Sequence, residues 1–184
     1  MTIDPYNHEH FGVMDLTWIE LESIVRGLAG RIRRDWNPDI VVGIAKGGVI
    51  PGAMISSAFR IDFVPIKLSS RHNEAIISKE PVWHVYPPAS SVTGKNVLLV
   101  DDICVAGRTF SMAIEELNMR GAAEVRTASV AIHEDSVKPD YAGLVSDACI
   151  IWPWERDVLS EDGRWVINPD YEAELKGEKS VTIT

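Results

Sequence analysis

Residues 97–109 read VLLVDDICVAGRT, and this stretch combines three kinds of residue in succession. The first four are apolar, which is the pattern of a strand buried on both faces of a sheet. Two carboxylates, Asp101 and Asp102, follow, and a loop of small residues then leads to Gly107. A helix is predicted over residues 109–119. The stretch therefore predicts an α/β unit with polar groups at the carboxyl end of its strand.

The same stretch predicts a phosphate site beside a site for hydroxyl groups or a metal ion. A helix start presents free amides and the positive end of the helix dipole, and Arg108 and Thr109 would add further donors. Because carboxylates repel phosphate, we expect Asp101 and Asp102 to face hydroxyl groups or a hard cation such as Mg²⁺. An isolated acidic pair after a strand is equally often a feature of a turn or a helix cap, and only the full stretch favours the ligand site.

The alternation of strand and helix continues along the chain. Thr17 and Glu20 have the spacing of a capping box, and apolar residues at helical spacing follow as far as Ile32. A second helix is expected after the turn Lys46-Gly47-Gly48. This order predicts a parallel β-sheet flanked by helices. The expected strands are residues 39–45, 63–68, 97–100, 125–132 and 148–151.

Two segments lack this alternation. Residues 69–93 are mostly polar, with a strand-like patch at residues 82–86, and so long a connection in a small domain predicts a flexible lid. Residues 155–184 are rich in charge and turn formers, which predicts an irregular tail. The expected organisation is one domain over residues 1–157 and a C-terminal tail over residues 158–184.

The composition limits the classes of function. The net charge of -9 disfavours a nucleic-acid surface, which needs many cationic side chains. No apolar stretch approaches the roughly 20 residues that span a bilayer, and the first 15 residues lack the pattern of a secretory signal. We therefore expect a cytoplasmic protein with no membrane partner. Cys104 and Cys149 lack metal-site spacing, so both are expected to be reduced thiols.

Residues 97–109 resemble the signature of type I phosphoribosyltransferases that binds phosphoribosyl pyrophosphate (PRPP). Residues 42–52, VGIAKGGVIPG, are similar to the pyrophosphate loop of the xanthine-guanine and hypoxanthine branch of that family. The resemblance implies the type I fold with a small hood subdomain and a flexible lid, and assembly as a homodimer or homotetramer. It covers residues 16–157, with further similarity at residues 16–18, 69–71, 138–141 and 152–155.

The resemblance also implies roles for individual residues. Asp101 and Asp102 would hold the ribose hydroxyls and Mg²⁺, and the loop as far as Thr109 would hold the 5-phosphate. Lys46 and Arg71 would complete the catalytic set by balancing the negative charge that develops on the departing pyrophosphate. The implied PRPP-binding residues are Lys46, Gly47, Asp101, Asp102, Val105, Ala106, Gly107, Arg108 and Thr109.

Three positions on the base side depart from the 6-oxopurine enzymes of this family. Val105 aligns with an aspartate proposed as the proton acceptor, and His133 aligns with a lysine that reads the 6-oxo group. Cys149 aligns with the stacking aromatic residue, for which Trp152 could substitute. A structural interpretation stays open for each, with His133 as an edge residue and Cys149 as a core filler. The implied base pocket comprises Val105, His133, Cys149, Ile150 and Trp152.

The leading hypothesis is an enzyme of purine salvage, a glycosyltransferase that moves the phosphoribosyl group from PRPP to a purine or purine-like base and releases pyrophosphate. The base-side departures leave a second hypothesis, a regulatory protein of the same fold that binds PRPP or a nucleotide without turnover. A hydrolase of nucleotide phosphates is a third, but it leaves the helix start at residues 107–109 unexplained.

Overall fold

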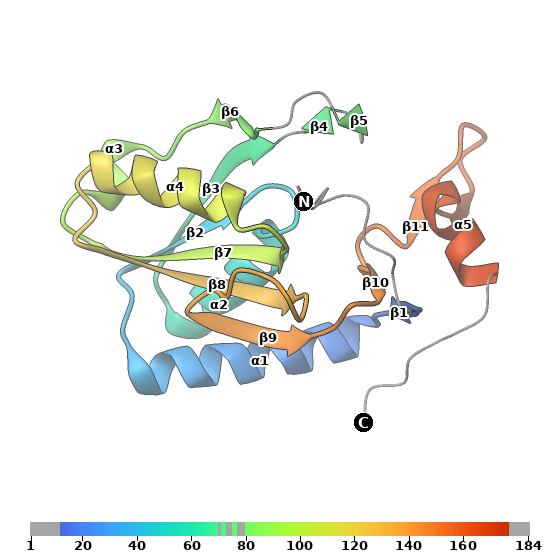
Figure 1. Cartoon of the computed structure of the whole chain (residues 1–184), viewed down its shortest axis with the longest axis horizontal. Coiled ribbons are helices and arrows are strands. Elements are labelled where there is room, and N and C mark those ends of the chain that lie inside the picture. Colours follow the sequence, from blue (N-terminus) through green and yellow to red (C-terminus); the bar gives the residue numbers. More distant parts are fainter. Residues whose placement is uncertain (1–11, 70, 73–74, 77–79, 177–184) are drawn as a thin grey trace. The chain divides into compact units, whose positions relative to one another are not determined.

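The chain forms two compact units, and a computed structural model describes residues 12–69, 71–72, 75–76 and 80–176. One unit comprises residues 24–145, and the other combines the residues up to 23 with those from 146 onward. Figure 1 shows the elements of both units along the chain. Within the described ranges, no helix has both the length and the apolar character needed to cross a membrane.

The larger unit is built on a six-stranded sheet with the strand order β6-β3-β2-β7-β8-β9. Five of the strands run parallel, and β6 pairs antiparallel with β3 at one edge. The predicted parallel α/β sheet is therefore confirmed. The strands are β2 (Ile40–Ile44), β3 (Asp62–Ser69), β6 (Val82–Val85), β7 (Asn96–Cys104), β8 (Glu124–Ile132) and β9 (Tyr141–Val145).

Helices cover both faces of this sheet (Figure 1). On one face α4 (Arg108–Met119) buries Phe110, Ala113 and Leu117 against the apolar side chains of β2 and β7. On the other face lies α2 (Val49–Phe59), whose Gly52 lies against Val41 of β2. α1 (Trp18–Asp35) packs on the sheet where the Ile24 side chain lies against Gly143 of β9.

α1 begins with the capping box that the sequence predicts. The Thr17 amide and hydroxyl donate to Glu20 Oε2 at 2.8 and 2.7 Å, and the Glu20 amide donates to Thr17 Oγ1 at 3.2 Å. These hydrogen bonds from Thr17 hold the pKa of the Glu20 carboxyl below its usual value. The predicted apolar stripe is buried along the helix, so this prediction is confirmed for Leu21, Val25, Leu28 and Ile32.

Gly27 lies on the exposed side of α1, and a Cβ there would meet no atom within 4 Å. We expect Gly27→Ala to raise the free energy of unfolding by about 0.5–1 kcal/mol, because glycine is that much poorer than alanine inside a helix. Urea denaturation measures the change. Gly43→Ala should have the opposite effect and lower the free energy of unfolding, since its Cβ would lie 2.7 Å from both Gly48 O and the Phe63 ring. Gly27→Ala with lower stability than the wild type would contradict the prediction.

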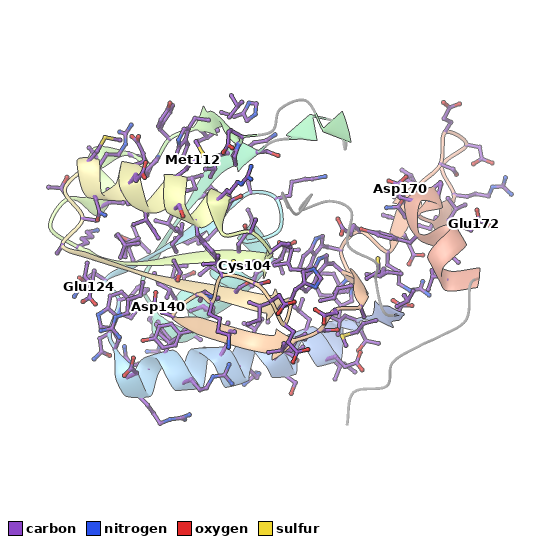
Figure 2. All side chains as sticks on the ribbon, viewed as in Figure 1. Cys104, Met112, Glu124, Asp140, Asp170 and Glu172 are labelled. Carbon is purple, nitrogen blue, oxygen red and sulfur yellow. The ribbon has the colours of Figure 1, made fainter. Side chains whose placement is uncertain are left out.

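Residues 138–141, which carry part of the family resemblance, form a polar network at the amino ends of β8 and β9. Asp140 accepts hydrogen bonds from the Thr127 amide and hydroxyl at 2.7 and 2.8 Å. The Tyr141 hydroxyl donates to Asp35 of α1 at 2.5 Å and accepts from Arg126 at 3.0 Å. Figure 2 shows Asp140 at the end of the sheet opposite to Cys104. This motif therefore ties the sheet to α1.

The predicted lid, residues 69–93, lies partly outside the described residues, at positions 70, 73–74 and 77–79. Of its described part, β4 (Arg71–His72) and β5 (Ala75–Ile76) pair antiparallel with each other. The strand expected at residues 82–86 is β6, and the short helix α3 (Ala89–Val92) follows it. Residues Val82–Val85 are therefore part of the sheet, and the flexible lid over residues 69–93 stays a prediction.

The smaller unit contains two pairs of short strands. β1 (Val13–Asp15) pairs parallel with β10 (Cys149–Ile151), and β11 (Asp157–Leu159) pairs antiparallel with β12 (Trp165–Ile167). The helix α5 (Pro169–Lys176) follows β12. The expectation of an irregular tail was wrong here, because the residues from Asp157 to Lys176 form a hairpin and a helix. The predicted domain boundary at residue 157 stays a prediction.

Candidate functional site

The candidate site lies at the carboxyl ends of β2 and β7, which are neighbours in the sheet. Ligands of open parallel sheets bind at this edge. The parallel register places Gly43 of β2 beside Val100 of β7, so the turn after β2 follows next to Asp101. The peptide bond between Ala45 and Lys46 in this turn is cis. The structure therefore brings together the two sequence motifs that were predicted to hold PRPP.

Two glycines allow the two motifs to touch. A Cβ at Gly47 would lie 2.0 Å from Oδ2 of Asp102, and a Cβ at Gly48 would lie 2.2 Å from the carbonyl oxygen of Val100. Only a hydrogen atom fits in either gap, because both distances are far shorter than any contact between heavy atoms. The Asp102 carboxylate consequently lies directly against the Gly47 α-carbon. Lys46, which precedes Gly47 in the turn after β2, has an exposed side chain.

The acidic pair belongs to β7 itself, because the strand continues to Cys104 instead of ending at Val100 as predicted. Both residues are partly exposed as a whole. The Asp102 amide donates to Asp101 Oδ1 at 3.0 Å, and the Ile103 amide donates to Asp102 Oδ1 at 2.7 Å. Burial raises the pKa of Asp101 well above its usual value, and the negative charge of Asp102 raises it further. Such a pair attracts a cation or hydrogen-bond donors.

The loop between β7 and α4 keeps donors for an anion. Gly107 has a φ of 70°, a conformation that favours glycine, and it is the N-cap of α4. Among the described residues, none accepts a hydrogen bond from the backbone amide of Val105 or Ala106. Arg108 Nη1 lies 3.0 Å from Glu80 Oε1, and the half-buried Thr109 lies in the first turn of α4. The predicted phosphate loop therefore directly precedes a helix start, and its role in binding phosphate stays a prediction.

The loop after β8 contacts the same region, although the sequence analysis did not include it in the PRPP site. The Ser136 hydroxyl donates to the carbonyl oxygen of Cys104 at 2.8 Å and accepts from the His133 amide at 3.0 Å. Ser129 Oγ lies 3.2 Å from the carbonyl oxygen of Asp102. Ser136 lies in a loop, and Ser129 is a single polar residue inside the apolar strand β8, so neither belongs to a periodic pattern that a single sequence could reveal.

The residues predicted to form the base pocket divide between the two units. Val105 and His133 belong to the larger unit, where His133 is buried at the end of β8. Cys149 and Ile150 lie in β10 of the smaller unit, and Trp152 stacks on Trp154 there with ring centroids 5.1 Å apart. Their joint role as a base pocket stays a prediction.

Arg71 lies in β4, and its side chain lies outside the described part of the structure. Its role in catalysis therefore also stays a prediction.

The acidic pair fits a magnesium ion that arrives with its substrate. Within the described ranges, no group of three or more His, Cys, Asp or Glu side chains could by itself hold a metal ion. Mg²⁺ is commonly bound through one or two carboxylates together with substrate phosphates and water. Asp101 and Asp102 would supply that smaller set of ligands, and magnesium binding stays a prediction.

Cys104 is buried, and its thiol donates to the carbonyl oxygen of Val137 at 3.2 Å. Burial, assisted by the charge of Asp101, raises its pKa to about 11. Since the thiolate is the reactive form, we expect Cys104 to react with iodoacetamide at pH 8 far more slowly in the native protein than in urea. The native rate should rise as the pH approaches that pKa.

Mass spectrometry of the labelled peptides measures the reaction at Cys104, with the half-buried Cys149 as an internal comparison. Equal labelling of Cys104 in the native and the urea-unfolded protein would contradict the prediction.

The chain belongs to the phosphoribosyl transferase domain family, which matches residues 16–162. This match confirms the family predicted from the sequence. The adenine phosphoribosyltransferase of Bordetella pertussis is 31% identical over 98 residues, covering 50% of this chain and 54% of the relative. Xanthine phosphoribosyltransferase 1 of Saccharomyces cerevisiae is 24% identical over 192 residues, covering 80% of this chain and 92% of the relative.

The solved structure of a purine phosphoribosyltransferase from Pyrococcus horikoshii is also similar. It superposes with a TM-score of 0.70 at 29% identity, covering 81% of this chain and 98% of that structure. The chain spans about half the length of the adenine phosphoribosyltransferases that it matches. The type I fold is therefore confirmed, and the cytoplasmic location and the oligomeric state stay predictions.

Proposed function

We propose that this protein transfers the phosphoribosyl group from PRPP to a purine or purine-like base and releases pyrophosphate. The observation that carries the proposal is the contact between Gly47 and the Asp102 carboxylate, which joins the diphosphate loop to the acidic pair. Membership of the phosphoribosyl transferase domain family supports it, and so do the purine bases in the names of similar proteins.

Displacement of pyrophosphate from the ribose makes the sugar ring positive and the leaving group more negative. In the proposed reaction, Asp101 and Asp102 hold the ribose hydroxyls and the metal, while the amides of Val105 and Ala106 bind the 5-phosphate. Lys46, whose side chain is exposed in the turn after β2, would lie at the departing diphosphate. Bound Mg²⁺ would neutralise part of the charge of the diphosphate. The residues of the chain thus act by positioning and by electrostatic stabilisation.

The acceptor is proposed to be a purine-type base that needs no carboxylate beside it. Val105 cannot accept a proton, so the proposal gives no acid-base role to this position. In this proposal, His133 donates a hydrogen bond to the base. The acceptor is therefore tested with a panel that includes both amino and oxo purines.

The test follows pyrophosphate release with PRPP, Mg²⁺ and one base at a time from adenine, guanine, hypoxanthine and xanthine. We expect pyrophosphate to appear together with one nucleoside monophosphate in equal amounts, identified by mass spectrometry. Calorimetric titration with PRPP and Mg²⁺ accompanies the assay. Tight binding without turnover with any base would favour the regulatory alternative. Absence of PRPP binding would remove both.

A further inference from the structure

The loop that follows β8, residues 133–137, contacts the phosphate loop at three points. The Ser136 hydroxyl donates to the carbonyl oxygen of Cys104 at 2.8 Å, and the Cys104 thiol donates to the carbonyl oxygen of Val137 at 3.2 Å. The Val137 side chain would lie 3.0 Å from a Cβ on Gly107. These contacts fall at both ends of the phosphate loop.

Ser136 is itself fixed to the end of β8. Its hydroxyl accepts from the His133 amide at 3.0 Å, and its own amide donates to the carbonyl oxygen of His133 at 3.1 Å. A hydroxyl has one proton to donate, and here it is directed at Cys104, the last residue of β7. Ser136 therefore joins the end of β8 to the residue at which the phosphate loop leaves β7.

Val137 contacts the other end of the phosphate loop, at Gly107. Gly107 adopts a φ of 70°, and the Val137 side chain covers its α-carbon. Val137 is 60% exposed, so this contact adds little to the buried core. The amides of Val105 and Ala106, which are proposed to bind the 5-phosphate, lie between the two ends that Ser136 and Val137 hold.

We propose that Ser136, together with Val137, is a positioning residue that sets the geometry of the phosphate loop and thereby the affinity for PRPP. The inference rests on the proposed function, because it concerns how the same site holds the sugar phosphate. It also means that the loop that carries His133 and the phosphate loop move together, since Ser136 is bonded to both.

The test compares variants of Ser136 by calorimetric titration with PRPP and Mg²⁺ in the absence of a base. Ser136→Ala is expected to weaken binding about tenfold, the usual effect of one lost hydrogen bond. Ser136→Thr keeps the hydroxyl and should restore affinity to within about threefold of the wild type.

Ser111→Ala is the matched control, because it also removes a hydroxyl that is bonded to this loop. Ser111 Oγ donates to the carbonyl oxygen of Gly107 at 3.1 Å, but the Ser111 amide donates to the same oxygen at 2.9 Å. Affinity for PRPP should therefore be unchanged in this variant.

A purely structural role would lower the thermal midpoint of Ser136→Ala and leave its affinity for PRPP at the wild-type value, which would overturn the inference. If Ser136→Ala does not fold, Val137→Ala decides, since it alters an exposed side chain and keeps every backbone hydrogen bond. We expect binding about threefold weaker there, and unchanged binding would overturn the inference. A wild-type protein that fails to bind PRPP would refute the proposed function first, whereas equal binding by the wild type and the variants refutes this inference alone.

Discussion

Asp102→Asn is expected to lower kcat/KM for PRPP by about 100-fold and to leave the fold intact. The amide has nearly the same shape as the carboxylate and keeps the oxygen that accepts from the Ile103 amide at 2.7 Å. It lacks the negative charge that the ribose hydroxyls and Mg²⁺ would require. Steady-state kinetics with the accepted base measure the change in activity, and thermal unfolding measures the change in stability.

Asp62→Asn is the matched control for this variant. Asp62 is an exposed aspartate at the first residue of β3, which is the amino end of the same parallel sheet. It should show wild-type kinetics, because ligands bind at the opposite edge. Wild-type kinetics in Asp102→Asn would remove Asp102 from the mechanism. A loss of activity that is accompanied by unfolding of the variant at the assay temperature would give Asp102 a structural role instead.

The sequence correctly predicted those elements that have a long hydrophobic pattern or begin with a capping motif. The apolar stripe of α1 extends over several turns and starts at the capping box of Thr17 and Glu20, so its period and its beginning agree. By contrast, β9 was missed although it completes the sheet. A Cβ at Gly143 would lie 2.2 Å from the carbonyl oxygen of Val130 and 2.6 Å from the Ile24 side chain. Close packing against β8 and α1 thus requires glycine at position 143. Glycine there interrupts the apolar pattern by which a strand is identified in a sequence.

Pairing between distant segments was not predictable from local patterns. A strand was expected near residues 148–151, and its position is right, but its partner β1 lies more than a hundred residues earlier in the chain. β11 and β12 have three residues each, too few to show a period of two. A polar sequence with turn formers consequently appeared irregular although it contains a hairpin.

The candidate site was predictable where a motif spans several residues. The acidic pair and the turn Lys46-Gly47-Gly48 each stand directly after an apolar strand, and the parallel register then brings them together. The contact distances were not predictable, because they depend on the packing of two strands that are far apart in the sequence. Only the structure places Asp102 against Gly47 and the carbonyl oxygen of Val100 against Gly48.

Gly47→Ala is expected to reduce kcat/KM for PRPP by about 100-fold or more while the protein stays folded. Its Cβ would lie 2.0 Å from the Asp102 carboxylate, a side chain that can rotate away, so the variant displaces the proposed catalytic group. A displacement of about 1 Å can lower a rate about 100-fold. Steady-state kinetics and urea denaturation measure the two effects separately.

Gly48→Ala provides the contrast at the next residue. Its Cβ would lie 2.2 Å from Val100 O and 2.8 Å from Ile44 N, which are backbone atoms of two paired strands. The free energy of unfolding should fall by about 1–3 kcal/mol or more, since the strands themselves must move. The double variant of Gly47→Ala and Asp102→Asn then tests the cause. If Gly47→Ala acts by displacing Asp102, the double variant should be no less active than Asp102→Asn alone, whereas additive losses would give Gly47 a role independent of that carboxylate.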